Sequence, residues 1–411
     1  MKPTVLVATT RRWFPTARMA MALANAGCAV EVVCPPGHPV GKTSAVDRTH
    51  TYDGLAPLAS FADAIATIKP DLIVPSDDLS TWHLQSLYHR ERHRGTTKSL
   101  VCALIERSLG AHESFPVVYA RTAFMDMARE EGIRVPTTEV VTNTNDLRKW
   151  IARMGLPTVL KANGTSGGDG VRVVQTLEEA ECAFRALESP PLFARAAKRA
   201  LVNNDKTLVW PSLLRHRSAV NAQAFVAGRE ATSTIACWKG TVLASLHFEV
   251  LNKQTSLGPA TVVRLMEDAQ MSAAAGRMVR RLNLSGLHGF DFMLEASTGN
   301  PYLIEINPRT TQVGHLTLGP GRDLPAALYA ALSGEALRAA PKLTENDTIT
   351  LFPQEWIWNP ASVFLRSGYH DVPWGEPDLV RACVRIPPKQ SPWYSRQRWI
   401  EAFSAVRLPR L

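Results

Sequence analysis

Acidic and amide side chains interrupt two apolar, strand-like segments in the last third of the chain. The segments, 289–294 and 301–309, are joined by the turn Glu-Ala-Ser-Thr-Gly-Asn, which predicts a β-hairpin. Residues two apart on a strand share a face, so Glu305 and Asn307 project together, and Asp291 on the neighbouring strand can converge on them. Two carboxylates and an amide oxygen suit Mg²⁺, with Mn²⁺ as a substitute, better than zinc. The alternative is a pair of solvated acids at a sheet edge.

Two further cations accompany this oxygen-rich set. Arg309 lies on the same strand face as the acids and would offer a fixed cation to a phosphate. In segment 158–174 an apolar strand ends at Lys161, and a glycine-rich loop leads into a second apolar run. Four glycines within seven positions, Gly167 and Gly168 among them, let backbone N–H groups close around phosphates. No Gly-Lys-Ser/Thr follows, so the segment is not a P-loop, and a plain flexible hairpin is the alternative.

The elements before these motifs predict a small parallel α/β domain. Apolar runs at 4–8, 29–34 and 71–75 alternate with helical patterns at 16–26 and 58–68, which is the βαβ arrangement of a Rossmann-like fold.

No Gly-x-Gly-x-x-Gly follows the first of these runs, so we do not expect a dinucleotide there. Arg11, Arg12 or Arg18 would meet an anionic substrate or lie solvated beside a helix start. Asp77 and Asp78 are expected to cap the next helix.

Composition places the chain among ordinary globular proteins. Its 411 residues imply two or three domains, and 45% hydrophobic with 20% charged residues is unexceptional. No apolar run reaches 18 residues, so neither a membrane span nor a signal peptide is expected. Six cysteines without a Cys-x-x-Cys pair argue against zinc and against disulfides, and a reducing cytoplasm is the expected setting. The net charge of +9 is compatible with anionic small molecules, nucleic acid or a membrane surface.

The order of these motifs resembles the ATP-grasp superfamily in its carbamoyl-phosphate-synthetase-like branch. Its signature is an acid in one strand and Glu-x-Asn-x-Arg in the next, and the resemblance spans residues 121–332. It implies an α/β and α+β architecture, with the ATP-grasp fold behind a Rossmann-like domain. The implied units are a Rossmann-like domain at 1–113, an ATP-grasp domain at 114–338 with a lid at about 155–215, and a small C-terminal extension at 339–411.

The resemblance also implies a role for each candidate residue. Mg²⁺ would be held by Asp291, Glu305 and Asn307, and Lys161 and Arg309 would act on the reacting phosphate. The ATP contacts implied are Arg121, Lys161, Gly167 and Gly168 at the phosphates, Gln223 with the backbone of Phe225 and Val226 at adenine, and Glu230 at the ribose. Gln223 departs from the glutamate more common in the family, although an amide can still pair with an exocyclic amine.

The implied activity is ATP-dependent ligation of a small carboxylate to an amine, or to a thiol, with release of ADP. A bicarbonate-activating enzyme is a second interpretation, but Gly314 stands where biotin carboxylases carry their glutamate base. A third is a non-catalytic nucleotide-binding regulator or scaffold that uses the C-terminal tryptophans and arginines to bind a partner. We expect small-molecule substrates and no nucleic acid, and the sequence leaves a homodimer open.

Overall fold

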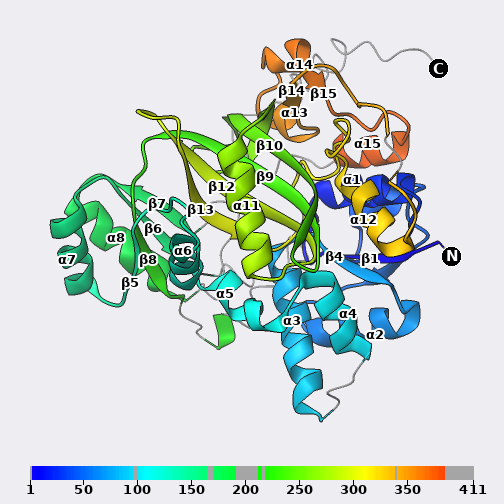
Figure 1. The fold of residues 1–411 in the computed structure, drawn as a ribbon, viewed down its shortest axis with the longest axis horizontal. Coiled ribbons are helices and arrows are strands. Elements are labelled where there is room, and N and C mark those ends of the chain that lie inside the picture. Colours follow the sequence, from blue (N-terminus) through cyan, green and yellow to red (C-terminus); the bar gives the residue numbers. More distant parts are fainter. Residues whose placement is uncertain are drawn as a thin grey trace.

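The computed structural model describes residues 2–95, 100–163, 170–190, 212–214, 218–337 and 340–384. These residues form three β-sheets with helices around them (Figure 1). The glycine-rich loop with Gly167 and Gly168, and the tail after residue 384, lie outside the described residues.

The N-terminal sheet is parallel and has the strand order β3-β2-β1-β4. The predicted runs at 4–8 and 29–34 coincide with its first two strands. Its strands are β1 (Thr4–Ala8), β2 (Ala29–Cys34), β3 (Arg48–Thr51) and β4 (Leu72–Pro75). Helices α1 (Pro15–Asn25), α2 (Pro57–Ile68), α3 (Asp78–His93) and α4 (Leu100–Leu109) accompany it, with short 3-10 turns η1 (Pro39–Lys42) and η2 (His112–Ser114). The Rossmann-like prediction is confirmed.

A seven-stranded sheet forms the centre of the molecule, with the order β13-β12-β9-β10-β11-β14-β15. Its strands are β9 (Gly228–Trp238), β10 (Thr241–Lys253), β11 (Ala260–Met266), β12 (Gly286–Glu295), β13 (Pro301–Asn307), β14 (Thr348–Thr350) and β15 (Tyr369–His370). The predicted hairpin is formed by β12 and β13, which pair antiparallel. Only the pair of the last two strands is parallel.

Helices cover both faces of the central sheet. Ile235 of β9 packs with α6 (Arg121–Glu130) and α11 (Ala269–Arg281), whereas its neighbour Ala236 packs with α1 and α12 (Leu324–Ser333). Successive residues of a strand point to opposite faces, so this alternation separates two apolar layers. The short helix α5 (Phe115–Tyr119) leads into α6. The sheet is therefore held firmly enough to fix the polar residues at its ends.

A separate four-stranded antiparallel sheet, β5-β8-β6-β7, lies beside the central one (Figure 1). It contains β5 (Thr138–Val141), β6 (Thr158–Ala162), β7 (Val171–Val174) and β8 (Val220–Ala224), with α7 (Thr144–Met154) and α8 (Leu177–Glu188). Trp150 and Phe184 pack in its core. The sheet extends from residue 138 to 224, which is wider than the 155–215 expected for the lid.

The C-terminal segment joins the central sheet rather than standing apart. Strands β14 and β15 extend the sheet at its β11 edge, and α13 (Gln354–Trp358), α14 (Phe364–Ser367) and α15 (Pro377–Val384) surround them. Asp371 directly follows β15; its side chain is 2% exposed, and it binds both Arg18 of α1 and Nε2 of His315, the latter at 2.6 Å. Arg18 is therefore committed to an internal ion pair and is not free to meet a substrate.

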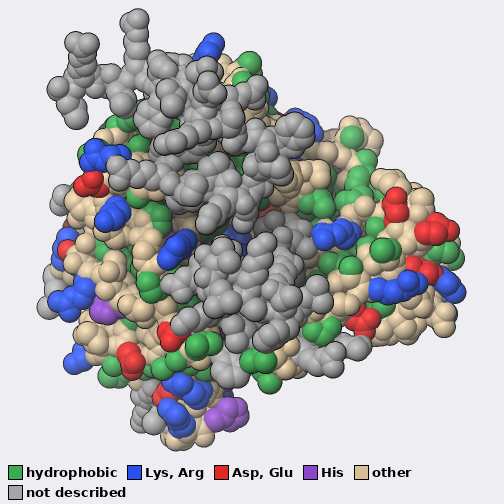
Figure 2. Space-filling model, turned by 180° about the vertical axis from the view of Figure 1, so that it is seen from behind, with side chains coloured by type: hydrophobic (Ala, Val, Ile, Leu, Met, Phe, Trp, Pro, Cys, Tyr) green, Lys and Arg blue, Asp and Glu red, His purple; other side chains and the backbone are tan. Residues whose placement is uncertain are grey.

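Two properties of the described surface bear on its surroundings. Lys and Arg side chains are scattered among acidic ones over the face seen from behind, without one continuous basic band (Figure 2). No helix in the described ranges has both the length and the apolar character needed to cross a bilayer.

Candidate active site

A cavity of about 330 Å³ opens between the four-stranded sheet and the central sheet. Its walls include every predicted site residue that the structure describes. These residues are Arg121, Lys161, Gln223, Phe225, Val226, Glu230, Asp291, Glu305, Asn307 and Arg309. They come from α6, β6, β8, β9, β12, β13 and the segments adjoining them, so distant parts of the chain converge on one space.

The two acids face each other across the β12–β13 hairpin. Asp291 and Glu305 are directly opposed in the strand register. Asp291 Oδ1 accepts a hydrogen bond from Thr232 Oγ1 at 2.9 Å, and its Oδ2 accepts from Asn307 Nδ2 at 2.8 Å. Burial and the nearby charge of Glu305 raise the pKa of Asp291 to about 6. This carboxylate is thus crowded by like charge, and a divalent cation would relieve that repulsion.

Glu305 differs from Asp291 because it has cationic partners. Its Oε2 lies 2.9 Å from Nη1 of Arg121. Burial alone would raise the pKa of Glu305, but the charges of Arg121 and Lys161 outweigh it and hold the pKa below its usual value. Sequence comparison implied a phosphate contact for Arg121, and the structure adds this ion pair, which the sequence did not suggest.

Lys161 is almost completely buried at the end of β6. Its Nζ donates to the carbonyl oxygen of Ile304 at 3.4 Å, which places the ammonium beside the acid pair. Burial lowers the pKa of Lys161 to about 8, although the charge of Glu305 opposes that shift. An anionic ligand in the cavity would hold this lysine in its charged form.

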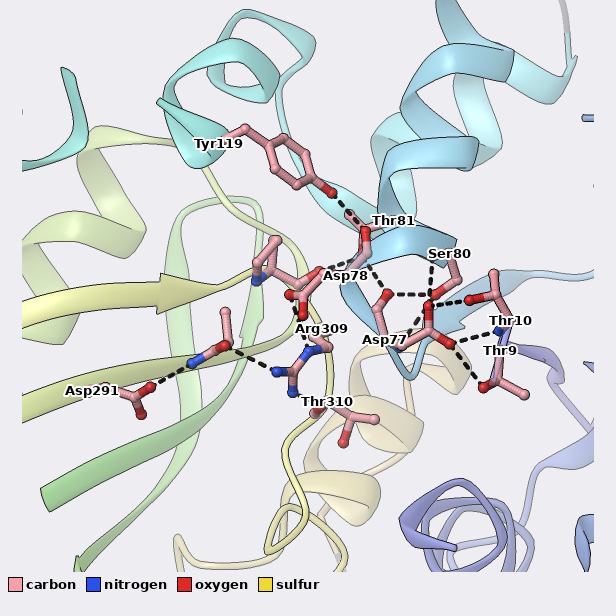
Figure 3. A network of polar contacts seen from close by, with 12 residues as sticks. Thr9, Thr10, Asp77, Asp78, Ser80, Thr81, Tyr119, Asp291, Arg309 and Thr310 are labelled. Carbon is pink, nitrogen blue, oxygen red and sulfur yellow. Dashed lines mark hydrogen bonds and ion pairs between the residues drawn. The ribbon is translucent and has the colours of Figure 1, made fainter. Parts of the chain in front are cut away.

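Arg309 is fixed from several sides (Figure 3). Its Nε lies 3.1 Å from Oδ1 of Asp78, and its Nη2 donates to Oδ1 of Asn307 at 3.0 Å. Its Cζ lies 5.4 Å from the centre of the Trp13 ring, in a cation–π contact. Asp78 and Trp13 both belong to the N-terminal domain, so that domain reaches into the site.

The donor set suits a hard divalent cation. The carboxylates of Asp291 and Glu305 and the amide of Asn307 offer oxygen atoms of the kind that such a cation binds, and burial together with the charge of Glu305 raises the pKa of Asp291. In this structure the amide oxygen of Asn307 faces Arg309 and its nitrogen faces Asp291. The amide would have to turn over to ligate a metal. Within the described ranges, no three His, Cys, Asp or Glu side chains form a metal-binding group.

The cavity also has apolar lining residues. Val159, Val171, Phe292 and Met293 contribute uncharged side chains of the kind that a planar base requires. Gln223 is buried, and its Nε2 donates to Thr138 Oγ1 at 3.0 Å. Its amide nitrogen is therefore already engaged.

Phe225 and Glu230 stand near the entrance. The Phe225 side chain is 41% exposed and lies on the segment that connects β8 to β9. Glu230 Oε1 lies 2.6 Å from Nζ of Lys253, and this lysine also donates to the carbonyl oxygen of Ser256. The acid expected at a ribose is thus paired with a lysine in the protein alone, and the sequence did not reveal that contact.

Asp77 and Asp78 differ in role although they are adjacent. Asp77 caps α3 by accepting from Ser80 N at 2.8 Å, as predicted, and it also accepts from Thr10 Oγ1 at 2.9 Å. Asp78 was expected to cap as well, but its side chain is the partner of Arg309. No pattern in the sequence connects positions so far apart.

Gly314 is enclosed in the protein interior. A Cβ there would lie 3.1 Å from Thr310 Oγ1 and 3.3 Å from both Met19 Cε and Thr234 Oγ1. The position has no room for a longer side chain unless its neighbours move, so the described site lacks the base that a biotin-carboxylase-type reaction would use at this point.

Comparisons with known proteins agree with this geometry. The family described as "Carbamoyl-phosphate synthase L chain, ATP binding domain" matches residues 120–318. Acetyl-CoA carboxylase from Dictyostelium discoideum is 25% identical over 211 residues, which is 49% of this chain and 8% of that protein. In four of the curated relatives, the aligned region covers 8% to 35% of the relative's own length.

Solved structures extend the likeness to the fold. N5-carboxyaminoimidazole synthetase from Staphylococcus aureus superposes with a TM-score of 0.57 at 14% identity, covering 82% of this chain and 79% of that one. Carboxyaminoimidazole ribonucleotide synthase from Aspergillus clavatus, complexed with ATP, gives 0.57 at 17% identity, with 81% and 77% covered. At these identities the likeness establishes the fold alone. The family match adds that residues 120–318 of this chain are similar to the ATP-binding domain of the carbamoyl-phosphate synthase L chain.

Proposed function

We propose that this protein is an ATP- and Mg²⁺-dependent ligase that activates a small carboxylate as an acyl phosphate and joins it to an amine. The observation that supports it most strongly is the convergence of ten predicted residues on one 330 Å³ cavity. An ATP-binding family match over residues 120–318 and an ATP-complexed structural neighbour support the nucleotide.

The reaction would proceed in two steps. A carboxylate oxygen of the substrate attacks the γ-phosphorus of ATP, the bond to the bridging oxygen breaks, and ADP leaves. The amine lone pair then attacks the acyl carbon, inorganic phosphate departs, and the amine gives up a proton. Such chemistry depends on in-line positioning and on neutralising charge, and less on side-chain bases.

This chain's cations are arranged for that task. Lys161 reaches the acid pair from β6, and Arg309 follows the acid-bearing strand β13; each would hold oxygens of the transferring phosphoryl group. Arg121 balances Glu305 in the protein alone and would also contact a phosphate. Mg²⁺ bound by Asp291, Glu305 and Asn307 would supply further neutralisation of the polyphosphate.

The base and ribose would lie against the apolar lining residues of the cavity. The backbone of Phe225 and Val226 would read the adenine edge beside Gln223, and Glu230 would accept from the ribose hydroxyls. Since Glu230 binds Lys253 in the protein alone, nucleotide binding would break that ion pair. Gly167 and Gly168, outside the described residues, are proposed to cover the phosphates.

The test is release of ADP from MgATP in the presence of paired carboxylates and amines, drawn first from amino acids and small acids. We expect ADP to form when both substrates are present, or when the carboxylate is present without the amine. Without the carboxylate, we expect none. Bicarbonate in place of the carboxylate should not support turnover. A purified, folded protein that neither binds MgATP by calorimetry nor releases ADP with any pair would contradict the proposal. The homodimer also stays a prediction, for which light scattering of the purified protein is the measurement.

A further inference from the structure

The turn after β13 is fastened to the N-terminal domain by its backbone. Thr81 Oγ1 of α3 donates to the carbonyl oxygen of Pro308 at 2.8 Å. The amide nitrogen of Thr310 donates to the carbonyl oxygen of Pro75, the last residue of β4, at 3.0 Å. Arg309 lies between these two contacts, so the residue that faces the proposed phosphate site stands on the boundary between two domains (Figure 3).

Asp78 adds a charged contact at the same boundary. Its Oδ1 lies 3.1 Å from Arg309 Nε, and the exposed fractions of the two side chains are 22% and 13%. The Asp78 backbone is also fixed, because its carbonyl oxygen accepts from Tyr119 Oη at 3.0 Å. Asn307 Oδ1 accepts a hydrogen bond from a second nitrogen of Arg309, so the guanidinium has little freedom to change its direction.

The second oxygen of Asp78 points to a role beyond one ion pair. Oδ2 of Asp78 and Nε of Arg121 are both buried and have no hydrogen-bond partner within the part of the chain that the structure describes. Both residues line a small cavity of about 40 Å³, together with Tyr119 and Glu305. That space can hold a water molecule, which could bridge a carboxylate and a guanidinium. Asp78 therefore borders both arginines of the proposed phosphate site.

We propose that Asp78 is a positioning residue: from the N-terminal domain it orients Arg309 for the γ-phosphate. The inference rests on the proposed function and adds a requirement that the N-terminal domain be docked before the phosphate site is complete. Two effects of Asp78 oppose each other. Its negative charge repels a polyphosphate, whereas its hydrogen bond holds the arginine in a productive direction.

These opposing effects allow a decisive experiment with the full-length protein. Affinities for a non-hydrolysable ATP analogue and for ADP, each with Mg²⁺, are measured by calorimetry for wild type, Asp78→Ala and Asp78→Asn. We expect Asp78→Ala to weaken analogue binding about tenfold with little change for ADP. Asp78→Asn keeps an acceptor for Arg309 and should lose less. If both variants bind the analogue as well as, or more tightly than, wild type, Asp78 contributes only charge and the proposal is overturned.

A double variant tests the route through Arg309. If Asp78 acts through this arginine, adding Asp78→Ala to Arg309→Gln should weaken analogue binding no further than Arg309→Gln alone. Additive losses would overturn the proposal. The matched control is Asp126→Asn, which removes the same charge from an exposed ion pair with Arg129 on α6 and should leave both affinities unchanged.

The outcomes distinguish a failure of the proposed function from a failure of the positioning role of Asp78. A folded wild-type protein that binds neither nucleotide would overturn the proposed function, and this inference with it. A wild-type protein that binds both, with variants that match it, would overturn the inference alone. Thermal unfolding of each variant identifies any that fail to fold, and the isosteric Asn variant then provides the comparison.

Discussion

Two clusters of buried charge in this molecule differ in how far their charges are satisfied. Around Asp371, a carboxylate accepts from both Arg18 and His315. Burial would raise the pKa of Asp371, but His315 and Arg18 outweigh it and hold that pKa below its usual value. In the candidate active site, Asp291 faces a second acid, and its pKa rises to about 6.

The contrast gives Asp371 a part in stabilising the fold and makes Asp291 a candidate for ligand binding. A carboxylate with a lowered pKa stabilises the folded state, whereas one with a raised pKa destabilises it at neutral pH. Proteins tolerate such destabilising groups mainly where function needs them. Asp291 borders a cavity large enough for a ligand, and Asp371 joins three distant segments of the chain.

The largest effect is expected from Glu305→Gln. Loss of this carboxylate should reduce Mg²⁺-dependent ADP release by about 10³-fold, because charge neutralisation at the phosphate carries most of the rate. Folding should suffer less, by roughly 1–3 kcal/mol, from the loss of the Arg121 ion pair. Turnover assays and denaturant unfolding measure the two effects, and unchanged turnover would remove Glu305 from the proposed metal site.

Asp371→Asn should show the reverse pattern. Removing one partner of a buried ion pair leaves Arg18 without its counter-charge, so the free energy of unfolding should fall by about 3–5 kcal/mol. Nucleotide affinity of the remaining folded protein should stay the same. Glu345→Gln is the control, because its carboxylate is 82% exposed beside Lys342 and its loss should change stability by less than about 0.5 kcal/mol. If Asp371→Asn lowered the free energy of unfolding only slightly, the two clusters would not differ in how much they stabilise the fold.

Asp291→Asn should stabilise the metal-free protein at pH 7. The variant removes repulsion with Glu305 while keeping an oxygen that can accept from Asn307, so the free energy of unfolding should rise by roughly 1–2 kcal/mol. Binding of Mg²⁺ with nucleotide should weaken at the same time. Denaturant unfolding in a chelating buffer measures the first effect, and a loss of stability there would show that Asp291 is structural like Asp371.

The smallest expected effect is on the stability of the protein at acidic pH. Because the pKa of Asp371 is lower in the folded protein than in the unfolded chain, its contribution is present above the ordinary aspartate pKa of about 3.9 and is lost as pH falls through the folded value. Wild type should therefore lose stability more steeply than Asp371→Asn as the pH falls below about 4. Parallel unfolding curves in that window would contradict the direction of this pKa shift.

Much of the secondary structure could be predicted from the sequence, because local residue patterns determine it. Alternating apolar residues predicted β1, β2 and the β12–β13 hairpin close to their observed bounds. The shared face of Glu305 and Asn307 follows from strand periodicity alone. The roles of the site residues came from ordered motifs, and only ligand binding can test them.

Contacts between segments that are distant in the chain could not be predicted from the sequence. The partner of Arg309 is a residue of the N-terminal domain, and the partner of Arg18 follows β15. Strands β14 and β15 have three and two residues, too few for a periodic pattern to reveal them. These contacts depend on how the folded domains pack against one another. The residue pattern of a single sequence does not contain that information.

The pairing of Arg18 with Asp371 has a consequence for biosynthesis. During translation, α1 emerges long before Asp371, the residue that neutralises its Arg18, and β11 emerges before its sheet neighbour β14. The ion pair that fastens α1 to the segment after β15 can therefore form only once residue 371 has left the ribosome.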